Sequence, residues 1–167
     1  QSRGLGDVYK RQGYKIIGTY INSTMALHEA IDKGADEALL LDKNGNISEG
    51  SGENIFIVKD NKIYTPKKDH CLNGITRQSV ITIAKDFGIN VIEKDITYDE
   101  ACSADEAFFT GTAVEITPIT KIDSHKIGDG LRGPITKKLQ ETYGLIVSGQ
   151  NNPVSYTHLR AHETGYN

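Results

Sequence analysis

The sequence predicts a mixed fold of strands and helices, either α/β or α+β. Short apolar or alternating runs, which are typical of strands, are interleaved along the chain with longer segments whose apolar residues recur at helical spacing. Glycine and asparagine turn residues separate these runs. A hydrophobic content of 37% and a charged content of 25% are those of a globular chain, and 167 residues are enough for one core or for part of a larger protein.

The first half of the chain is expected to open with a helix and continue as strands. Apolar residues recur at helical spacing from Ser23 to Lys33, and Gly34 would end that helix. An apolar run at 37–42 predicts a buried strand. Asn44-Gly45 and Asp60-Asn61 are turn sequences, so we expect an antiparallel meander. Its strands are predicted at 37–42, 46–48, 53–59 and 62–65.

The second half is expected to alternate between helices and strands. After a loop at 66–73, the apolar spacing predicts an amphipathic helix over 75–87, which Gly88 would end. Pro134 suits the first turn of a helix that should extend to about Ser148. Between these helices we predict strands at 89–96, 107–110 and 116–122 and a short helical turn at 99–103, with Val91 and Ile92 buried.

Composition excludes several classes of partner. The net charge is −3 and no Lys/Arg block stands out, so nucleic acid and anionic membrane are poor partners. No apolar run approaches the ~20 residues that span a bilayer. Cys71 and Cys102 lack metal or redox spacing, which indicates reduced thiols and a cytoplasmic protein. His28, His70 and His125 share no ligand spacing, and we predict no metal site.

A calcium-loop pattern is present but incomplete. Asp42, Asn44, Asn46 and Glu53 fall at the first, third, fifth and twelfth positions of such a loop. The sixth position must be glycine for the sharp turn and is Ile47 here. The flanking segments also have strand patterns rather than helical ones, so the pattern does not predict a calcium site.

Both ends of the chain are expected to be non-native. Residues 1–12 do not continue the pattern that follows, and residues 152–167 resemble translated adaptor sequence. The chain also lacks an initiator Met. We therefore expect an internal fragment whose native domain is residues 13–151.

The segment 47–56 is the most informative in the chain. It places Glu49 between a predicted strand and a glycine-rich bend, Gly50-Ser51-Gly52, and a second strand follows at once. A carboxylate at such a bend can meet a ligand, because glycine lets a ligand approach the main chain closely. On this segment alone, a β-hairpin with a solvated glutamate is equally consistent.

Four segments together resemble the class IV aminotransferases, the branched-chain amino acid aminotransferases above all. They occur in order along the chain, at 15–23, 48–56, 72–77 and 109–118. The resemblance implies a C-terminal domain that binds pyridoxal 5'-phosphate, with a mixed sheet or barrel-like β core flanked by helices. Without it, Lys15 would be an ordinary surface lysine and Tyr20 an ordinary half-buried tyrosine.

The resemblance also implies a role for individual residues. Lys15 would form the Schiff base with the cofactor and move the proton in catalysis, and Tyr20 would contact the cofactor's 3-oxygen. Glu49 would keep the pyridine nitrogen protonated, so that the ring accepts electrons. The phosphate would be bound by Gly74, Ile75 and Thr76, where a helix begins, and by Gly111 and Thr112. Thr112 and Ala113 would bind the substrate.

Without the resemblance, these last two segments would be a capped helix start and a strand end with a glycine bulge. With it, the implied reaction moves the amino group between Leu, Ile or Val and 2-oxoglutarate. The alternatives are a D-amino acid aminotransferase, an aminodeoxychorismate lyase, or a cofactor-free binding domain on the same scaffold. In the family, an arginine and much of the substrate pocket come from the first half of the protein. The full-length enzyme is expected to be a homo-oligomer, and this fragment alone should be inactive.

Overall fold

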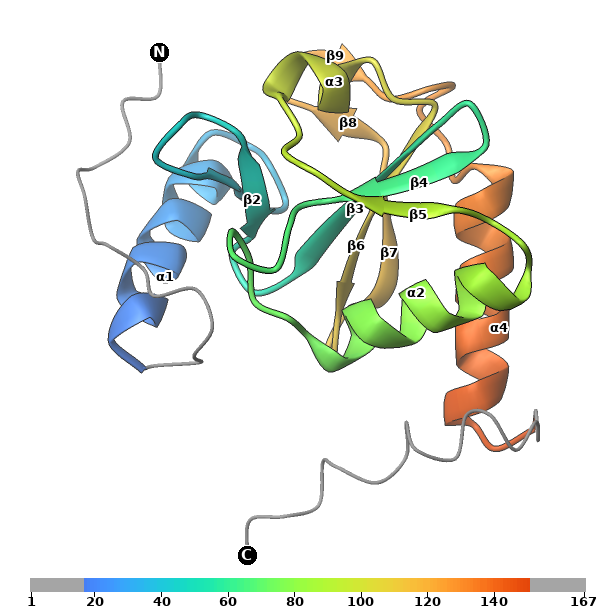
Figure 1. Cartoon of the computed structure of the whole chain (residues 1–167). Helices are drawn as coiled ribbons and strands as arrows, with labels where there is room; N and C mark the ends of the chain where they lie inside the picture. Colours follow the sequence, from blue (N-terminus) through green and yellow to red (C-terminus); the bar gives the residue numbers. More distant parts are fainter. Residues whose placement is uncertain (1–16, 151–167) are drawn as a thin grey trace, which may run out of the picture.

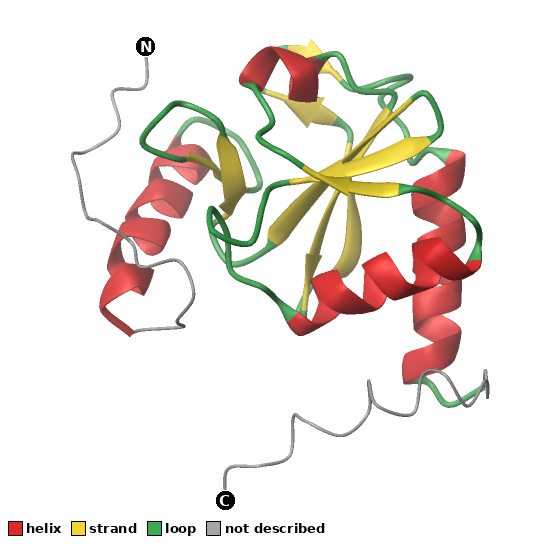
Figure 2. Ribbon diagram, in the orientation of Figure 1, coloured by secondary structure: helices red, strands yellow, loops and turns green. Residues whose placement is uncertain are grey.

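The computed structural model describes residues 17–150 of the chain. Helices and strands alternate along it as the sequence predicts, and Figures 1 and 2 show their arrangement. In chain order the elements are α1 (Ile17–Asp32), β1 (Leu39–Leu41), β2 (Ile47–Gly50), β3 (Asn54–Lys59), β4 (Lys62–Thr65), α2 (Ile75–Asp86), β5 (Val91–Glu93), α3 (Tyr98–Cys102), β6 (Glu106–Gly111), β7 (Glu115–Ile119), β8 (Lys121–Ile122), β9 (His125–Lys126) and α4 (Pro134–Val147).

A mixed five-stranded sheet, in the order β5-β4-β3-β6-β7, forms the centre of the domain. All of its neighbouring strands are antiparallel except β4 and β5, which are parallel. The helix α2 connects β4 to β5, as a parallel pair requires a crossover connection. The strands β3 and β6 lie in the middle of the sheet and are almost entirely buried.

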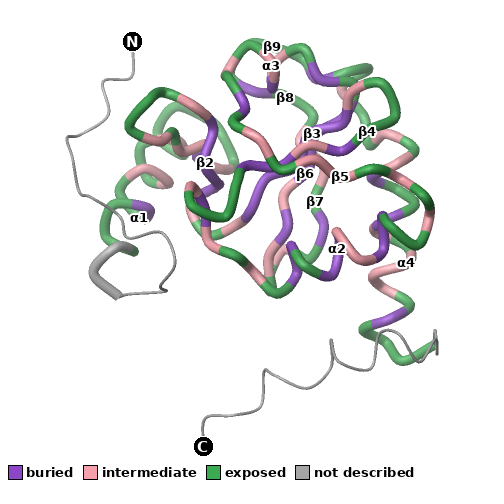
Figure 3. The backbone as a smooth tube through the Cα atoms, viewed as in Figure 1, coloured by how far each residue is buried: buried purple, intermediate pink, exposed green. Residues whose placement is uncertain are grey.

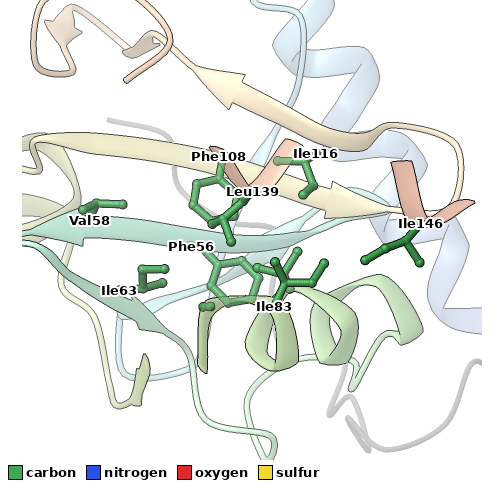
Figure 4. Packing of buried hydrophobic residues seen from close by; sticks show 10 residues of the cluster. Phe56, Val58, Ile63, Ile83, Phe108, Ile116, Leu139 and Ile146 are labelled. Carbon is green, nitrogen blue, oxygen red and sulfur yellow. The ribbon is translucent and has the colours of Figure 1, made fainter. Parts of the chain in front are cut away.

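Both faces of this sheet are covered, and the alternation of side chains along β3 explains how. Phe56 and Val58 point to one face, where α2 and α4 pack, while Ile55 and Ile57 point to the other. On the helix-covered face, Phe56 stacks on its cross-strand partner Phe108, with ring centroids 5.1 Å apart (Figure 4). Figure 3 shows buried stretches in β2 and along the central strands, and buried positions on α2 and α4.

Two small two-stranded sheets flank the central one. The strands β1 and β2 pair with each other, and β8 pairs with β9. In Figure 1 the helix α1 lies beside the β1–β2 pair, away from the central sheet. Large apolar side chains on α1 are exposed, with Ile21 67% and Met25 52% accessible. No helix among the described residues is long and apolar enough to cross a membrane.

Several elements agree closely with the sequence prediction. The strand at 62–65 is confirmed to the residue. The helix predicted over 75–87 ends one residue earlier, where Phe87 caps it. The helix predicted from Pro134 to about Ser148 ends at Val147, with Pro134 in the first turn. These elements are defined by local turn, cap and periodicity rules, which the sequence displays directly.

The predicted four-strand meander is wrong. The bend at 51–53 turns the chain after β2, so β1 and β2 form their own sheet, and only β3 and β4 join the central one. The strand predicted as buried at 37–42 shortens to β1, which is not fully buried, and Leu41 is 52% exposed.

Three other predictions also need correction. The first helix is already formed at Ile17, before the predicted start near Tyr20 and before the helical spacing that begins at Ser23. The strand predicted at 89–96 contracts to β5, a half-buried edge strand, so Val91 and Ile92 are not fully buried. The strand predicted at 116–122 breaks at Thr120 into β7 and β8, and β9 was not predicted.

Candidate active site

The start of α2 offers backbone donors that no side chain caps. Gly74 is the N-cap residue in an extended conformation, and it makes no side-chain cap. The starts of α4 and α3 differ from it. Glu106 accepts hydrogen bonds from the N–H groups of Ile135 (3.0 Å) and Thr136 (2.7 Å) at the start of α4. A capping box of Thr97 and Glu100 closes the start of α3. The first turn of α2 is therefore suited to bind an external anion.

A cleft of about 550 Å³ joins this helix start to the turn between β6 and β7. Thr76 and Thr112, from elements far apart in the sequence, both line it. Thr112 and Ala113 are exposed in the turn that follows Gly111, the last residue of β6. The cleft is lined by Ile75, Thr76, Ser79, Thr112, Glu115, Tyr143, Ile146, Val147, Ser148 and Gly149. The structure thus brings together the two segments predicted to bind phosphate.

Glu49 lies on β2, and its carboxylate is hydrogen-bonded to the segment that leads into α2. Its side chain is buried, with 6% of its surface accessible. Its Oε2 atom accepts a hydrogen bond from the N–H of Leu72 at 2.9 Å. Glu49 does not line the cleft of Thr76 and Thr112. Glu49 therefore contacts one end of the segment 72–75, at Leu72, and the helix start that lines the cleft lies at its other end, at Ile75.

The bend after Glu49 is packed tightly around Glu53. A Cβ atom on Gly50 would lie 2.8 Å from Glu53 Oε2 and 2.9 Å from a ring carbon of Phe109, so glycine is required there. Burial, with repulsion from Glu37 and Glu49, raises the pKa of Glu53 from 4.5 to about 7. The N–H of Gly52 donates to Glu53 Oε2 at 3.1 Å and opposes this shift.

The remaining predicted site residues fall in different places. Lys15 lies outside the described residues. Tyr20 lies on α1 and is 42% exposed. Gly74 and Ile75 begin α2, and Ile75 is 44% exposed. Of the residues that the resemblance assigns to the cofactor, Ile75, Thr76 and Thr112 line the cleft, and Tyr20 and Glu49 do not.

The calcium-like residues have a structural role in the β1–β2 hairpin. Asp42 Oδ1 accepts hydrogen bonds from the N–H groups of Asn44 (2.8 Å) and Asn46 (2.9 Å), which closes the turn. Its Oδ2 atom lies 2.8 Å from Nδ1 of His70. Although burial opposes it, these hydrogen bonds lower the pKa of Asp42. No cluster of metal-ligating side chains occurs among residues 17–150.

Sequence reasoning missed two groups of residues near the site. Tyr143 and the residues that end α4 form one wall of the cleft. Arg77 is fully buried beneath the segment 66–74, where its Nη2 donates to the Pro66 carbonyl at 2.9 Å and its Nη1 to Asn73 Oδ1 at 3.3 Å. The sequence showed only an arginine just inside a predicted helix start, and its burial, which is rare for arginine, appears only in the structure.

Comparison with known proteins points to one family. The family model described as "Amino-transferase class IV" matches residues 7–122. The chain is 59% identical over 133 residues to a Pseudomonas aeruginosa protein named "Branched-chain-amino-acid aminotransferase", a match that covers 80% of this chain and 43% of that protein. It is 50% identical over 139 residues to a "Probable branched-chain-amino-acid aminotransferase" of Aquifex aeolicus, covering 82% of the chain and 45% of that protein. The chain thus spans less than half the length of these relatives.

Solved structures agree with the sequence relatives. The fold is similar, with a TM-score of 0.85 and 47% identity, to a T.th. branched-chain amino acid aminotransferase complexed with N-(5'-phosphopyridoxyl)-L-glutamate. That match covers 89% of this chain and 50% of the other. A branched-chain amino acid aminotransferase from Thermobaculum terrenum in its PLP form matches with a TM-score of 0.86 and 36% identity, over 93% of this chain and 51% of that one.

Proposed function

The chain belongs to the class IV aminotransferases, and from this premise we propose that it is part of a branched-chain amino acid aminotransferase that uses pyridoxal 5'-phosphate. The observation that carries the proposal is the arrangement around the segment 72–75. A buried carboxylate, Glu49, contacts one end of this segment, and the uncapped start of α2 forms the other. These are the two kinds of group that a protonated ring nitrogen and a phosphate require.

The residues present fit this cofactor. The N–H groups of the first turn of α2 and the hydroxyls of Thr76 and Thr112 would bind the phosphate. The Glu49 carboxylate would pair with the ring nitrogen, and Tyr20 would approach the ring oxygen. These N–H groups and hydroxyls would donate hydrogen bonds to a dianionic phosphate. An arginine from the rest of the protein would add the positive charge that balances it. When bound, pyridoxal phosphate supplies an electron sink that stabilises negative charge at the substrate Cα.

Each residue of the chain would then have one task. Lys15 would take the proton from the substrate Cα and return it on the neighbouring cofactor carbon, which requires its amine to be neutral and close to both atoms. Glu49 would hold a proton on the ring nitrogen, because a carboxylate beside that nitrogen favours its charged form. Thr112 and the backbone near Ala113 would orient the substrate carboxylate, since both are exposed in the turn after β6. Transfer would be ping-pong, with the amino group passing from Leu, Ile or Val to 2-oxoglutarate.

The named relatives support this substrate class. Both sequence relatives have names that specify branched-chain amino acids, and one solved structure holds a phosphopyridoxyl group joined to L-glutamate. L-Glutamate is the product that forms when 2-oxoglutarate accepts an amino group. A D-amino acid aminotransferase or an aminodeoxychorismate lyase of the same fold is the alternative, and substrate assays separate them.

We also propose that the full-length protein is a cytoplasmic homo-oligomer. The apolar side chains exposed on α1 and β1, such as Ile21, Met25 and Leu41, favour burial against another part of the protein or another subunit. Cys71 and Cys102 form no disulfide within the described part of the chain, and reduced thiols are typical of a reducing compartment.

The test uses full-length protein that contains this chain. Addition of pyridoxal phosphate should give a visible absorption band, and borohydride should then fix the cofactor on Lys15, as peptide masses would show. Leucine should donate its amino group to 2-oxoglutarate, while D-alanine should not. Lys15→Ala should abolish both the adduct and the transfer, and Lys33→Ala, which removes an exposed lysine paired with Glu29, should change neither. An adduct on another lysine, or no band in the wild type, would overturn the proposal.

A further inference from the structure

Asn54, the first residue of β3, uses both ends of its side-chain amide on the segment that leads into α2. The side chain is buried, with 5% of its surface accessible. Its Nδ2 donates a hydrogen bond to the Leu72 carbonyl at 2.6 Å. Its Oδ1 fills the space beside Gly74, where a Cβ atom would lie only 2.4 Å away. Gly74 has an ordinary φ of −64°, so the neighbouring amide, and not the backbone conformation, requires glycine at this position.

Leu72, which Asn54 contacts, also forms a hydrogen bond with Glu49. Its N–H donates to Glu49 Oε2 and its carbonyl accepts from Asn54. Gly74, two residues further on, is the N-cap of α2. The backbone of residues 72–74 thus connects Glu49, the proposed ligand of the ring nitrogen, to the proposed phosphate turn at the start of α2. Asn54 contacts this stretch at two points, Leu72 and Gly74.

The rest of the segment 66–74 is held independently of Asn54. Arg77 donates to Pro66 and Asn73 near its two ends. The Ser48 hydroxyl donates to the His70 carbonyl, and Asp42 holds the His70 ring. Loss of the Asn54 amide should therefore shift the stretch 72–74 without unfolding the segment.

We propose that Asn54 is a positioning residue that sets the spacing between Glu49 and the first turn of α2. With the correct spacing, Glu49 can bind the ring nitrogen of a cofactor while the first turn of α2 binds its phosphate. The proposal rests on the proposed function. Pyridoxal phosphate is a rigid ring with a short phosphate arm. If either Glu49 or the first turn of α2 is displaced, the cofactor cannot make full contact with both. Displacements of about 1 Å in such contacts can cost about a hundredfold in rate. A ligand that meets only the phosphate turn would not depend on this spacing.

The test compares two ligands on the apo form of the full-length protein. Calorimetry gives the affinity for pyridoxal phosphate, which meets both ends, and for inorganic phosphate, which meets only the turn. Asn54→Ala should weaken pyridoxal phosphate about tenfold or more and leave inorganic phosphate within about twofold. The matched control is Asn90→Ala, an exposed asparagine beside β5, which should change neither affinity.

A second variant keeps the test decisive if Asn54→Ala does not fold. Gly74→Ala introduces the Cβ that meets Asn54 Oδ1, and it should weaken pyridoxal phosphate by a larger factor than inorganic phosphate. Where both single variants fold, the double variant should lose less than the sum of the two, because Asn54→Ala removes the atom that the new Cβ meets.

The outcomes distinguish failure of the inference from failure of the proposed function. Equal losses for both ligands would show that Asn54 only maintains the phosphate turn, and unchanged affinities would show that it positions nothing. Either result overturns the inference. A wild-type protein that binds no pyridoxal phosphate would instead overturn the proposed function.

Discussion

The unusual carboxyl of Glu53 gives a prediction about pH and stability. Burial and the neighbouring carboxylates of Glu37 and Glu49 raise its pKa to about 7, so the folded protein favours the neutral acid near neutral pH. The folded-state pKa exceeds the ordinary value of 4.5. The stability that the neutral form provides is therefore complete below about pH 4.5 and is lost as the pH rises towards 7.

The size of the effect follows from the gap between these two values. A gap of this size corresponds to a ceiling of about 3 kcal/mol. Glu53 is only partly buried, and solvent screening reduces this ceiling to about 1–2 kcal/mol. Glu53→Gln keeps the shape of the neutral acid and its acceptor for the Gly52 N–H, but it cannot ionise. We expect the variant to be about 1–2 kcal/mol more stable than wild type at pH 8, and close to wild type at pH 4.5.

The assay is urea unfolding of the wild type and each variant at pH 3, 4.5, 6 and 8, followed by circular dichroism. Glu100→Gln is the control of opposite sign. The pKa of Glu100 is lowered chiefly by a hydrogen bond from Lys94 and, to a lesser extent, by one from the N–H of Thr97. Its stabilisation is present above pH 4.5 and is lost as the pH falls, so this variant should be less stable than wild type at pH 8, and the difference should shrink in acid. A Glu53→Gln variant whose advantage does not grow between pH 4.5 and pH 8 would refute the reasoning.

Three further predictions concern the site and the core. Glu49→Gln should retain the fold but slow the proton-transfer step about a hundredfold in single-turnover absorbance measurements, and an unchanged rate would contradict the role of Glu49. Arg77→Met removes a buried cation that binds Pro66, Asn73 and Glu93, and should lower the free energy of unfolding by about 2–3 kcal/mol in urea titrations. Leu139→Ala should cost about 2–5 kcal/mol by the same measurement, because Leu139 is fully buried under the central sheet; a loss below about 1 kcal/mol would be inconsistent with that packing.

Much of the fold could be predicted from local signals. The helix from Pro134 and the strand at 62–65 have their ends where proline, glycine and turn residues place them. The pairing of strands could not be predicted in this way. The parallel contact of β4 with β5 and the separate β1–β2 sheet depend on which apolar faces meet across the domain. Residues near one another in sequence do not encode that choice.

The candidate site, like the fold, was predicted from the sequence only in part. The four motifs were enough to identify the family and to single out Glu49, Thr76 and Thr112, because such motifs carry the chemistry of the bound groups in their residue types and spacing. The resemblance predicted that Thr76 and Thr112 meet at one phosphate, and both line one cleft. Only the tertiary structure revealed that the end of α4 forms its wall and that Asn54 lies against Gly74. Burial next to Glu37 and Glu49 likewise decided the raised pKa of Glu53, a property that no local pattern contains. The physical reason is that residue type is local, whereas desolvation, close approach and shared ligands depend on segments that meet only after the chain has folded.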